Sequence, residues 1–309
     1  MNAVTKQSPW SRQVVDVMPS LNWAMLQQGP RPWLCLDGAC SESLEEDVQA
    51  VTKSLDYRWA WRGTAWEYSF PGYRQGPLLV PLDEALLTFA LDHWLRQQAG
   101  LILQGPDDRD SLLAHLQQLH QLEGSDGLPI GFRLHAMRSL EELCEGLPDD
   151  RRLDLFGPIQ RFIWHSEAGP SGEWLYADSP ATNQSVSKPD SVITLTPNDE
   201  DALDQASLAW FMRDCARETC QRIQAYGLAE NEKVLWGNLS CFVDEATEQL
   251  ALTAECDVRR YVALRFEHPQ EFFAKDAALR EILVKKHIQG KQRLLEAEAR
   301  LTTLASANS

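Results

Sequence analysis

The chain has 309 residues, about twice the length of a typical single domain, so we expect two lobes that each bury a core. Its 45 acidic residues outnumber its 29 basic residues, and a net charge of -16 would repel nucleic-acid phosphates and anionic membrane surfaces. We therefore expect no nucleic-acid partner and no membrane insertion, since charges also interrupt the apolar runs well before the roughly 20 residues that a spanning helix needs.

Residues 1–165 are predicted to form an α/β lobe that begins with a strand at 33–36, ending at Asp37-Gly38. Apolar residues at helical spacing follow over 43–55. The aromatic residues between 59 and 70 alternate with period two on either side of Gly63, which predicts a hairpin. Among them, Trp61, Trp66 and Phe70 are typical of a core, although an exposed patch for a partner is the alternative.

The same alternation of strands and helices continues to residue 164. A strand at 78–82 either ends at Pro81 or lies at a sheet edge, and Asp83 caps the helix that follows it. Further strands are expected at 101–103, 129–134 and 159–164, with a leucine-rich helix capped by Asp107 or Asp110 and a short helix over 139–144 between them. Because helices separate the strands, we expect a mixed or largely parallel sheet.

Residues 166–196 are rich in Gly, Pro and Ser and are predicted to be a linker or surface excursion with a brief strand at 174–176. Residues 197–309 are predicted to form an all-α lobe. Its helices are expected over 197–226, 230–250, 256–266 and 277–304, packed as a small bundle.

The sequence contains no familiar catalytic motif. G-x-G-x-x-G, G-x-x-x-x-G-K-[ST], G-x-S-x-G and H-E-x-x-H are all absent. Asp107, Asp108 and Asp110 stand before a helix, where carboxylates stabilise its positive end. Arg133 lies in an apolar strand, so it either faces solvent, pairs with a carboxylate or receives a ligand. We therefore expect no catalytic residue, no metal site and no cofactor.

The seven cysteines are scattered and form no C-x-x-C pair. An odd, scattered set is typical of reduced thiols rather than of a disulfide framework. The first twenty residues also lack the continuous apolar stretch of a secretory signal. These features together predict a cytoplasmic protein.

Five short motifs follow one another along the first lobe. They are LDGA at 36–39, GPLLVPL at 76–82, GLIL at 100–103, GFRLHAMRSL at 131–140, and FGP at 156–158 before the strand that ends at Trp164. In this order and spacing, residues 33–164 resemble the adaptor proteins of type VI secretion, which are effector chaperones once classed only as a domain of unknown function. The chain departs from the family pattern at His135-Ala136-Met137, where the family has Tyr-Asp-Pro.

The resemblance implies a two-lobed, non-catalytic adaptor. Such a protein binds a toxic secreted effector, often near the effector's N-terminal or spike-tip region. It then delivers the effector to the VgrG-type spike protein. By pattern position, the candidate partner-binding residues are Asp37, Arg133, Arg138 and Phe156. Two alternatives stay open: a hydrolase or transferase with an unrecognised active site, and an unrelated protein-interaction module.

Overall fold

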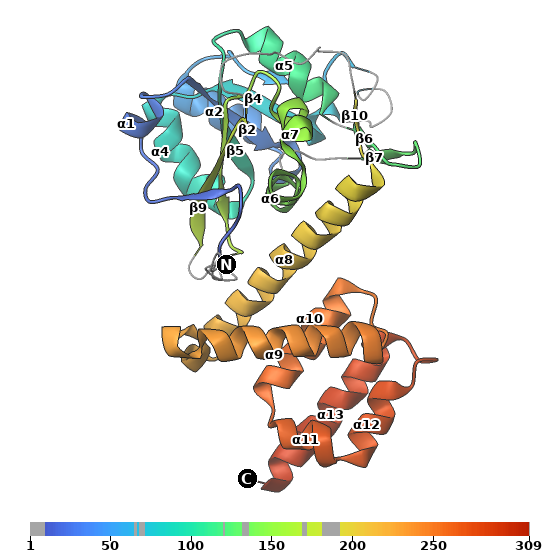
Figure 1. Cartoon of the computed structure of the whole chain (residues 1–309). Coiled ribbons are helices and arrows are strands. Elements are labelled where there is room, and N and C mark those ends of the chain that lie inside the picture. The colour runs from blue at the N-terminus through green and yellow to red at the C-terminus, as the bar shows by residue number, and fades with distance from the viewer. Residues whose placement is uncertain are drawn as a thin grey trace, which may run out of the picture. The chain divides into compact units, whose positions relative to one another are not determined.

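The computed structural model describes residues 10–64, 67, 72–119, 121–131, 136–168, 172–180 and 192–308 (Figure 1). The chain forms two compact units. The first, the α/β unit, comprises Met1–Glu167 and Gly172–Trp210, and the second, the helical unit, comprises Ala168–Ser171 and Phe211–Ser309. The chain passes from the first unit to the second within one helix, α8 (Pro197–Arg222).

The α/β unit is built on a seven-stranded sheet. In spatial order its strands are β1 (Asp16–Met18), β9 (Glu173–Asp178), β8 (Arg161–Ser166), β5 (Gly100–Gly105), β2 (Arg31–Asp37), β4 (Pro77–Pro81) and β3 (Arg58–Trp59). All neighbouring strands in this sheet are antiparallel. The expected mixed or largely parallel arrangement of this sheet is therefore wrong.

The error has a physical cause in the connection between β4 and β5. Helix α4 (Glu84–His93) joins these two strands, as in a parallel β-α-β unit, but β2 lies between them. Leu34 of β2 is opposite Val80 on one side and Ile102 on the other, and both pairings are antiparallel. Alternation of strands and helices along the chain thus predicted the elements but could not reveal a third strand inserted between two of them.

Helices cover both faces of the sheet, so its central strands are apolar on both sides. Trp33 and Cys35 of β2 pack in the core with α5 (Arg109–Gln118), α6 (Met137–Gly146) and α7 (Asp149–Phe156). Leu34 and Leu36 point the other way, into the core with α1 (Trp23–Leu26), α2 (Leu44–Thr52) and α4. The result is a three-layer arrangement (Figure 1). Successive side chains of a strand alternate between faces, which is why four consecutive apolar residues are all buried.

A second, smaller sheet accompanies the first. Strand β6 (Gln121–Glu123) pairs parallel with β10 (Ile193–Thr194) and antiparallel with β7 (Pro129–Gly131). β9, at the place of the expected brief strand, pairs with both β8 and β1 in the large sheet. Within 166–196, the structure therefore contains a strand of each sheet.

Local signals explain several helix starts. Asp83 caps α4 as expected, since its carboxylate accepts from the Leu86 amide. For α5 the cap is Asp108, which accepts from the Asp110 amide, rather than Asp107 or Asp110. α6 begins at Met137 without a side-chain cap, which is consistent with the missing Asp-Pro turn. Short 3-10 turns also occur at Gly38–Cys40, Tyr73–Gln75 and Leu95–Gln97.

The second unit is helical, as expected. After α8 come two 3-10 turns (Gln224–Gly227 and Ala229–Asn231), α9 (Glu232–Asp244), a π-helical turn (Glu245–Gln249), α10 (Glu255–Glu267), α11 (Gln270–Lys275), α12 (Ala277–Val284) and α13 (Gly290–Asn308). The single helix expected over 277–304 is two helices. In the described residues, no helix has the length and apolar character needed to cross a bilayer.

The buried guanidinium of Arg293 explains how the break between α12 and α13 is held. Its Nη1 donates to the carbonyl oxygens of Leu250, at 2.9 Å, and Leu283, at 2.6 Å. These carbonyls lie at the ends of two helical segments, where the partial charge is negative. One buried cation therefore satisfies the ends of two helical segments.

Candidate functional site

Asp37 lies at the end of β2 and organises a tight turn. Its carboxylate accepts a hydrogen bond of 2.9 Å from the Ala39 amide, and its own amide donates to the Ala99 carbonyl. The next residue, Gly38, has no room for a side chain, because an added Cβ would lie 1.8 Å from the carbonyl oxygen of Arg74. The Asp-Gly pair of the LDGA motif is thus explained by the turn that it forms.

Arg138 joins α6 to the part of α8 that belongs to the α/β unit. Its Nε donates to Glu142 at 2.7 Å, and its Nη2 donates to the Ser207 hydroxyl at 3.2 Å. The guanidinium carbon also lies 4.5 Å from the centre of the Trp210 ring, a cation–π distance. Arg138 therefore has packing partners on both helices and is about one-third exposed.

Phe156 is completely buried, and its ring centre lies 4.6 Å from that of Phe162. In this structure it contributes to the core and presents no surface to a partner. Arg133 lies outside the described residues, so its place relative to Asp37 and Arg138 is not part of the structure described. Of the aromatic residues weighed above, Trp61 is in the core, while Trp66 and Phe70 lie outside the described residues.

Helix α6 also holds the N-terminal segment of the described chain. Glu145 accepts three hydrogen bonds from successive backbone amides, those of Gln13, Val14 and Val15, at 2.7–3.0 Å. One turn earlier, the buried Glu141 pairs with Arg12 and accepts from the Ser166 hydroxyl. Carboxylates on one helix face thus fix the segment that leads into β1.

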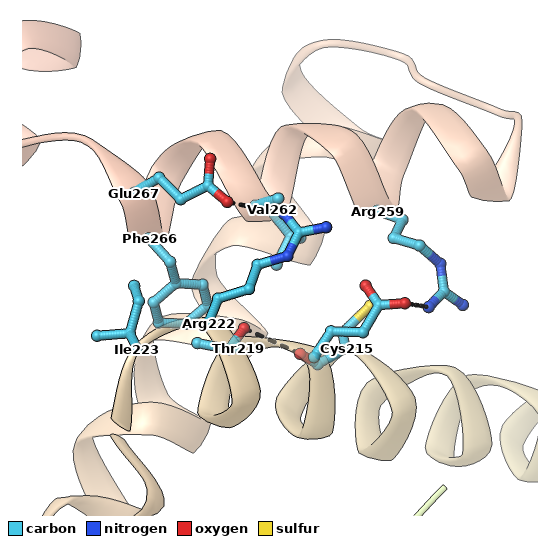
Figure 2. Close-up of a pocket in the computed structure, with 10 residues that line it drawn as sticks. Cys215, Thr219, Arg222, Ile223, Arg259, Val262, Phe266 and Glu267 are labelled. Atoms are coloured by element: carbon cyan, nitrogen blue, oxygen red, sulfur yellow. Dashed lines mark hydrogen bonds and ion pairs between the residues drawn. The ribbon is translucent and has the colours of Figure 1, made fainter. Parts of the chain in front are cut away.

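The helical unit contains a cleft between α8 and α10 (Figure 2). Its apolar side chains include Ile223, which directly follows α8, and Val262 and Phe266 of α10. The spacing of three or four residues between lining positions places them along one face of each helix. The cavity volume is about 10 Å³, about the space of one water molecule, so the cleft is too small for an organic substrate.

Ion pairs connect the two helices across this cleft. Arg222 donates to Glu267 at 2.7 Å (Figure 2). Arg259 donates to Glu218 at 2.8 Å and also contacts Asp214. Burial alone would lower the pKa of Arg259, but its hydrogen bond to Asp214 and the neighbouring carboxylates raise it overall. The guanidinium therefore stays charged and serves to hold α10 on α8.

Cys215 also lines the cleft, and its buried environment favours the protonated thiol. Burial is the main cause that raises its pKa to about 12. At neutral pH the side chain is thus a neutral thiol, which is a poor nucleophile and a poor metal ligand. Nearby, the Thr219 hydroxyl donates to the Cys215 carbonyl oxygen within the same helix. These contacts stabilise structure rather than prepare a reaction.

A separate hollow lies in the α/β unit, beside the terminal strand β3; we call it the β3 hollow. It has a volume of about 320 Å³ and is lined by Leu55, Tyr57, Arg58, Trp59, Arg62 and Leu113. This volume lies at the lower end of the range for ligand pockets. The β3 hollow combines two arginines with apolar side chains, and no residue in it was singled out by catalytic motifs.

Sequence reasoning missed both concave sites, because neither carries a motif of fixed spacing. The cleft could have been found from apolar and charged positions three or four apart in 215–223 and 259–267. The β3 hollow gives one weak signal, the basic and aromatic residues within 57–62. Among the described residues, no three His, Cys, Asp or Glu side chains are grouped so that they could hold a metal ion.

Comparison with known proteins gives one match. Residues 33–153 match the model of a family described as Domain of unknown function (DUF4123). Searches of the curated proteins and of the solved structures found no match to the chain.

Proposed function

We propose that this protein is a non-catalytic adaptor that binds a type VI secretion effector and helps load it onto the VgrG-type spike protein. The observation that carries the proposal is the family match over residues 33–153, because that domain occurs in adaptors of type VI effectors. The match covers most of β2 and all of β4 and β5, the strands that the LDGA, GPLLVPL and GLIL motifs overlap.

The physical character of the two concave sites supports binding rather than catalysis. In the cleft of the helical unit, the thiol of Cys215 is neutral and the arginines are engaged in ion pairs. In the β3 hollow, exposed cations stand beside apolar side chains, a combination that suits recognition of another polypeptide. In this proposal the effector is loaded onto the spike protein in the cytoplasm, before secretion.

The proposal is tested by co-expressing the chain with the effector encoded beside its gene, and separately with the spike protein. We expect a complex of defined stoichiometry in size-exclusion chromatography with light scattering, at moderate salt. An effector from an unrelated gene cluster serves as the control partner. Deleting the gene should abolish delivery of the neighbouring effector and leave delivery of the control effector unchanged.

Two results would contradict the adaptor proposal. One is the absence of any complex with either protein together with normal delivery in the deletion strain. The other is turnover of a substrate by the purified chain that a single substitution in a concave site abolishes, which would favour the hydrolase or transferase alternative.

A further inference from the structure

Two arginines in the β3 hollow differ from the other arginines described in the α/β unit. Arg58 donates to the carbonyl oxygen of Tyr57 at 2.8 Å, and the guanidinium of Arg62 lies 5.5 Å from the centre of the Tyr73 ring. Within the described residues, neither is within ion-pair distance of a carboxylate. The other described arginines of this unit all have such a partner; they are Arg12, Arg31, Arg74, Arg96, Arg109, Arg138, Arg151, Arg152 and Arg161.

The carboxylates nearest in sequence to the hollow are already bound elsewhere. Asp56 pairs with Arg109, and Glu45 accepts from both Arg74 and the indole of Trp59. Glu67 accepts a hydrogen bond of 2.6 Å from the Gly63 amide. Among the residues that the structure describes, these two cations therefore face the hollow without a matched anion, in a chain whose net charge is -16. Such a local excess of positive charge attracts an anionic ligand.

The rest of the wall is apolar and partly open. Leu55 is 64% exposed, while Trp59 is buried in the core that α2 and α4 share. Leu113 of α5 adds a further apolar side chain. A simple inorganic anion would leave this apolar surface in water, whereas an apolar side chain of a ligand would cover it.

We propose that the β3 hollow binds an acidic polypeptide segment in which a carboxylate stands beside an apolar side chain. The carboxylate pairs with Arg58 and Arg62, whose planar guanidinium groups can each form two parallel hydrogen bonds to it. The apolar side chain contacts Leu55 and Leu113. This inference rests on the proposed function and deepens it, because the effector would supply the segment.

Nucleic acid is a poorer occupant of the same hollow. A polyanion gains affinity from many phosphate contacts along a basic surface, whereas the hollow offers two arginines on a strongly acidic protein. A short acidic segment needs only those two cations. Because Arg58 lies in the terminal strand β3 and Arg62 follows soon after its end, the segment can reach both without any rearrangement of the core.

The test uses defined probes that do not depend on the adaptor proposal. Fluorescein-labelled peptides of alternating Asp and Leu, Asn and Leu, and Asp and Ser are titrated with the full chain, and binding is followed by fluorescence anisotropy. We expect the Asp/Leu peptide to bind at least about 10-fold more tightly than either other peptide, since only it offers both charge and apolar surface. An equally long oligo-dT is included as a nucleic-acid probe.

Variants assign the binding to the hollow. The double variant Arg58→Glu/Arg62→Glu should weaken binding of the Asp/Leu peptide at least about 10-fold. Arg58→Lys/Arg62→Lys keeps both charges but loses the paired hydrogen bonds, so it should weaken binding less than the Glu variant does. The matched control Arg31→Glu/Arg96→Glu changes the net charge by the same amount at exposed arginines outside the hollow and should leave binding within about twofold. Leu55→Ser should weaken binding of the Asp/Leu peptide more than binding of the Asp/Ser peptide. Circular dichroism confirms that each variant is folded.

The inference is overturned if the Asp/Leu peptide does not bind or if the two double Glu variants weaken its binding equally. It is also overturned if oligo-dT binds more tightly than the Asp/Leu peptide. The complex with the neighbouring effector separates this inference from the proposed function. If the effector binds the wild type and the Arg58→Glu/Arg62→Glu variant equally, the adaptor function stands and the assignment of the hollow is wrong. If no effector complex forms but the peptide results hold, the adaptor proposal alone is contradicted.

Discussion

The Nε of Arg12 lies 2.7 Å from Oε1 of Glu141, and the two side chains are only 2% and 1% exposed. This ion pair joins the segment before β1 to α6. Arg12 has a second, longer contact with Glu173, and Glu141 also accepts from Ser166. A charge buried in this way is stabilised only while its partner is present, because the interior solvates it poorly.

Replacing Glu141 with Ala should therefore destabilise the α/β unit by about 3 kcal/mol. The double variant Arg12→Met/Glu141→Leu should recover much of this loss, because it removes both charges together. Urea unfolding followed by tryptophan fluorescence measures the effect, since all tryptophans except Trp236 belong to this unit. The exposed pair Asp92–Arg96 provides the control, and Asp92→Asn should cost less than about 1 kcal/mol. Equal costs at Glu141 and Asp92 would show that the buried pair has no special role.

Gly38 is predicted to be indispensable for the turn after β2. In Gly38→Ala the new Cβ would meet the Arg74 carbonyl oxygen, the Gly76 carbonyl oxygen and the Trp59 ring. Since two of these atoms belong to the backbone, they cannot move away independently, and we expect a loss of about 1–3 kcal/mol. At Gly131 an added Cβ meets no atom within 4 Å, so Gly131→Ala is the matched control. The same urea titration compares the two, and an unchanged midpoint for Gly38→Ala would contradict the steric argument.

His115 should make the α/β unit less stable in mild acid. Desolvation is the main cause that lowers its pKa from the usual value near 6.5, against the opposing effects of the Leu155 carbonyl and Asp154. Its Nε2 donates to the Leu155 carbonyl oxygen at 3.0 Å, so the neutral ring holds α5 to α7.

The sign of the pH effect follows from proton binding in the two states. Below about pH 6.5 the unfolded chain binds a proton at His115 that the folded chain does not, so stability falls as the pH falls towards the folded pKa. Above pH 6.5 the effect is absent. His115→Gln keeps a donor near Nε2 but does not titrate, so its stability should fall less between pH 7.5 and 5. His165, whose pKa burial also lowers, keeps a similar dependence in both proteins. Parallel curves for wild type and variant would contradict the role of His115.

The cysteines should divide into reactive and protected groups. Cys40, Cys241 and Cys256 are exposed, whereas Cys35, Cys144 and Cys215 are buried. Burial is the largest cause that raises the pKa of Cys35 to about 12, and it raises that of Cys144 further. A chromogenic disulfide reagent at pH 8, with mass spectrometry of the labelled peptides, should therefore modify the exposed group in the native protein. The buried group should react only in denaturant. Rapid native labelling of Cys35 would show that β2 is not a protected strand.

The sequence predicted elements better than their pairing. The apolar run of β2 and the cap at Asp83 are local signals, and both were confirmed. The insertion of β2 between β4 and β5 is a long-range relationship that no local pattern encodes, so the sheet type was wrong. The break between α12 and α13 was missed for a similar reason, because the contact of Arg293 with the Leu250 carbonyl joins distant segments.

The same limit applies to the candidate sites. Pattern matching selected Asp37 and Phe156, and the structure gives them a turn and a core contact. Pattern matching could not select the β3 hollow. Arg58 and Arg62 stand out only because the nearby carboxylates pair with other arginines. That is known only once Asp56 is seen beside Arg109 and Glu45 beside Arg74.

The strand order of the large sheet determines how much of the chain must be synthesised before the sheet can form. Residues 33–153, the stretch that matches the family model, include neither β1 nor the strands β8 and β9. A polypeptide cut to that stretch would leave the Ile102–Gln104 side of β5 without its partner β8 and open to pairing with other chains. During synthesis, β1 has no pairing partner until β9 has left the ribosome, because Asp16 pairs with Tyr176. The nascent chain therefore cannot complete the sheet before that point.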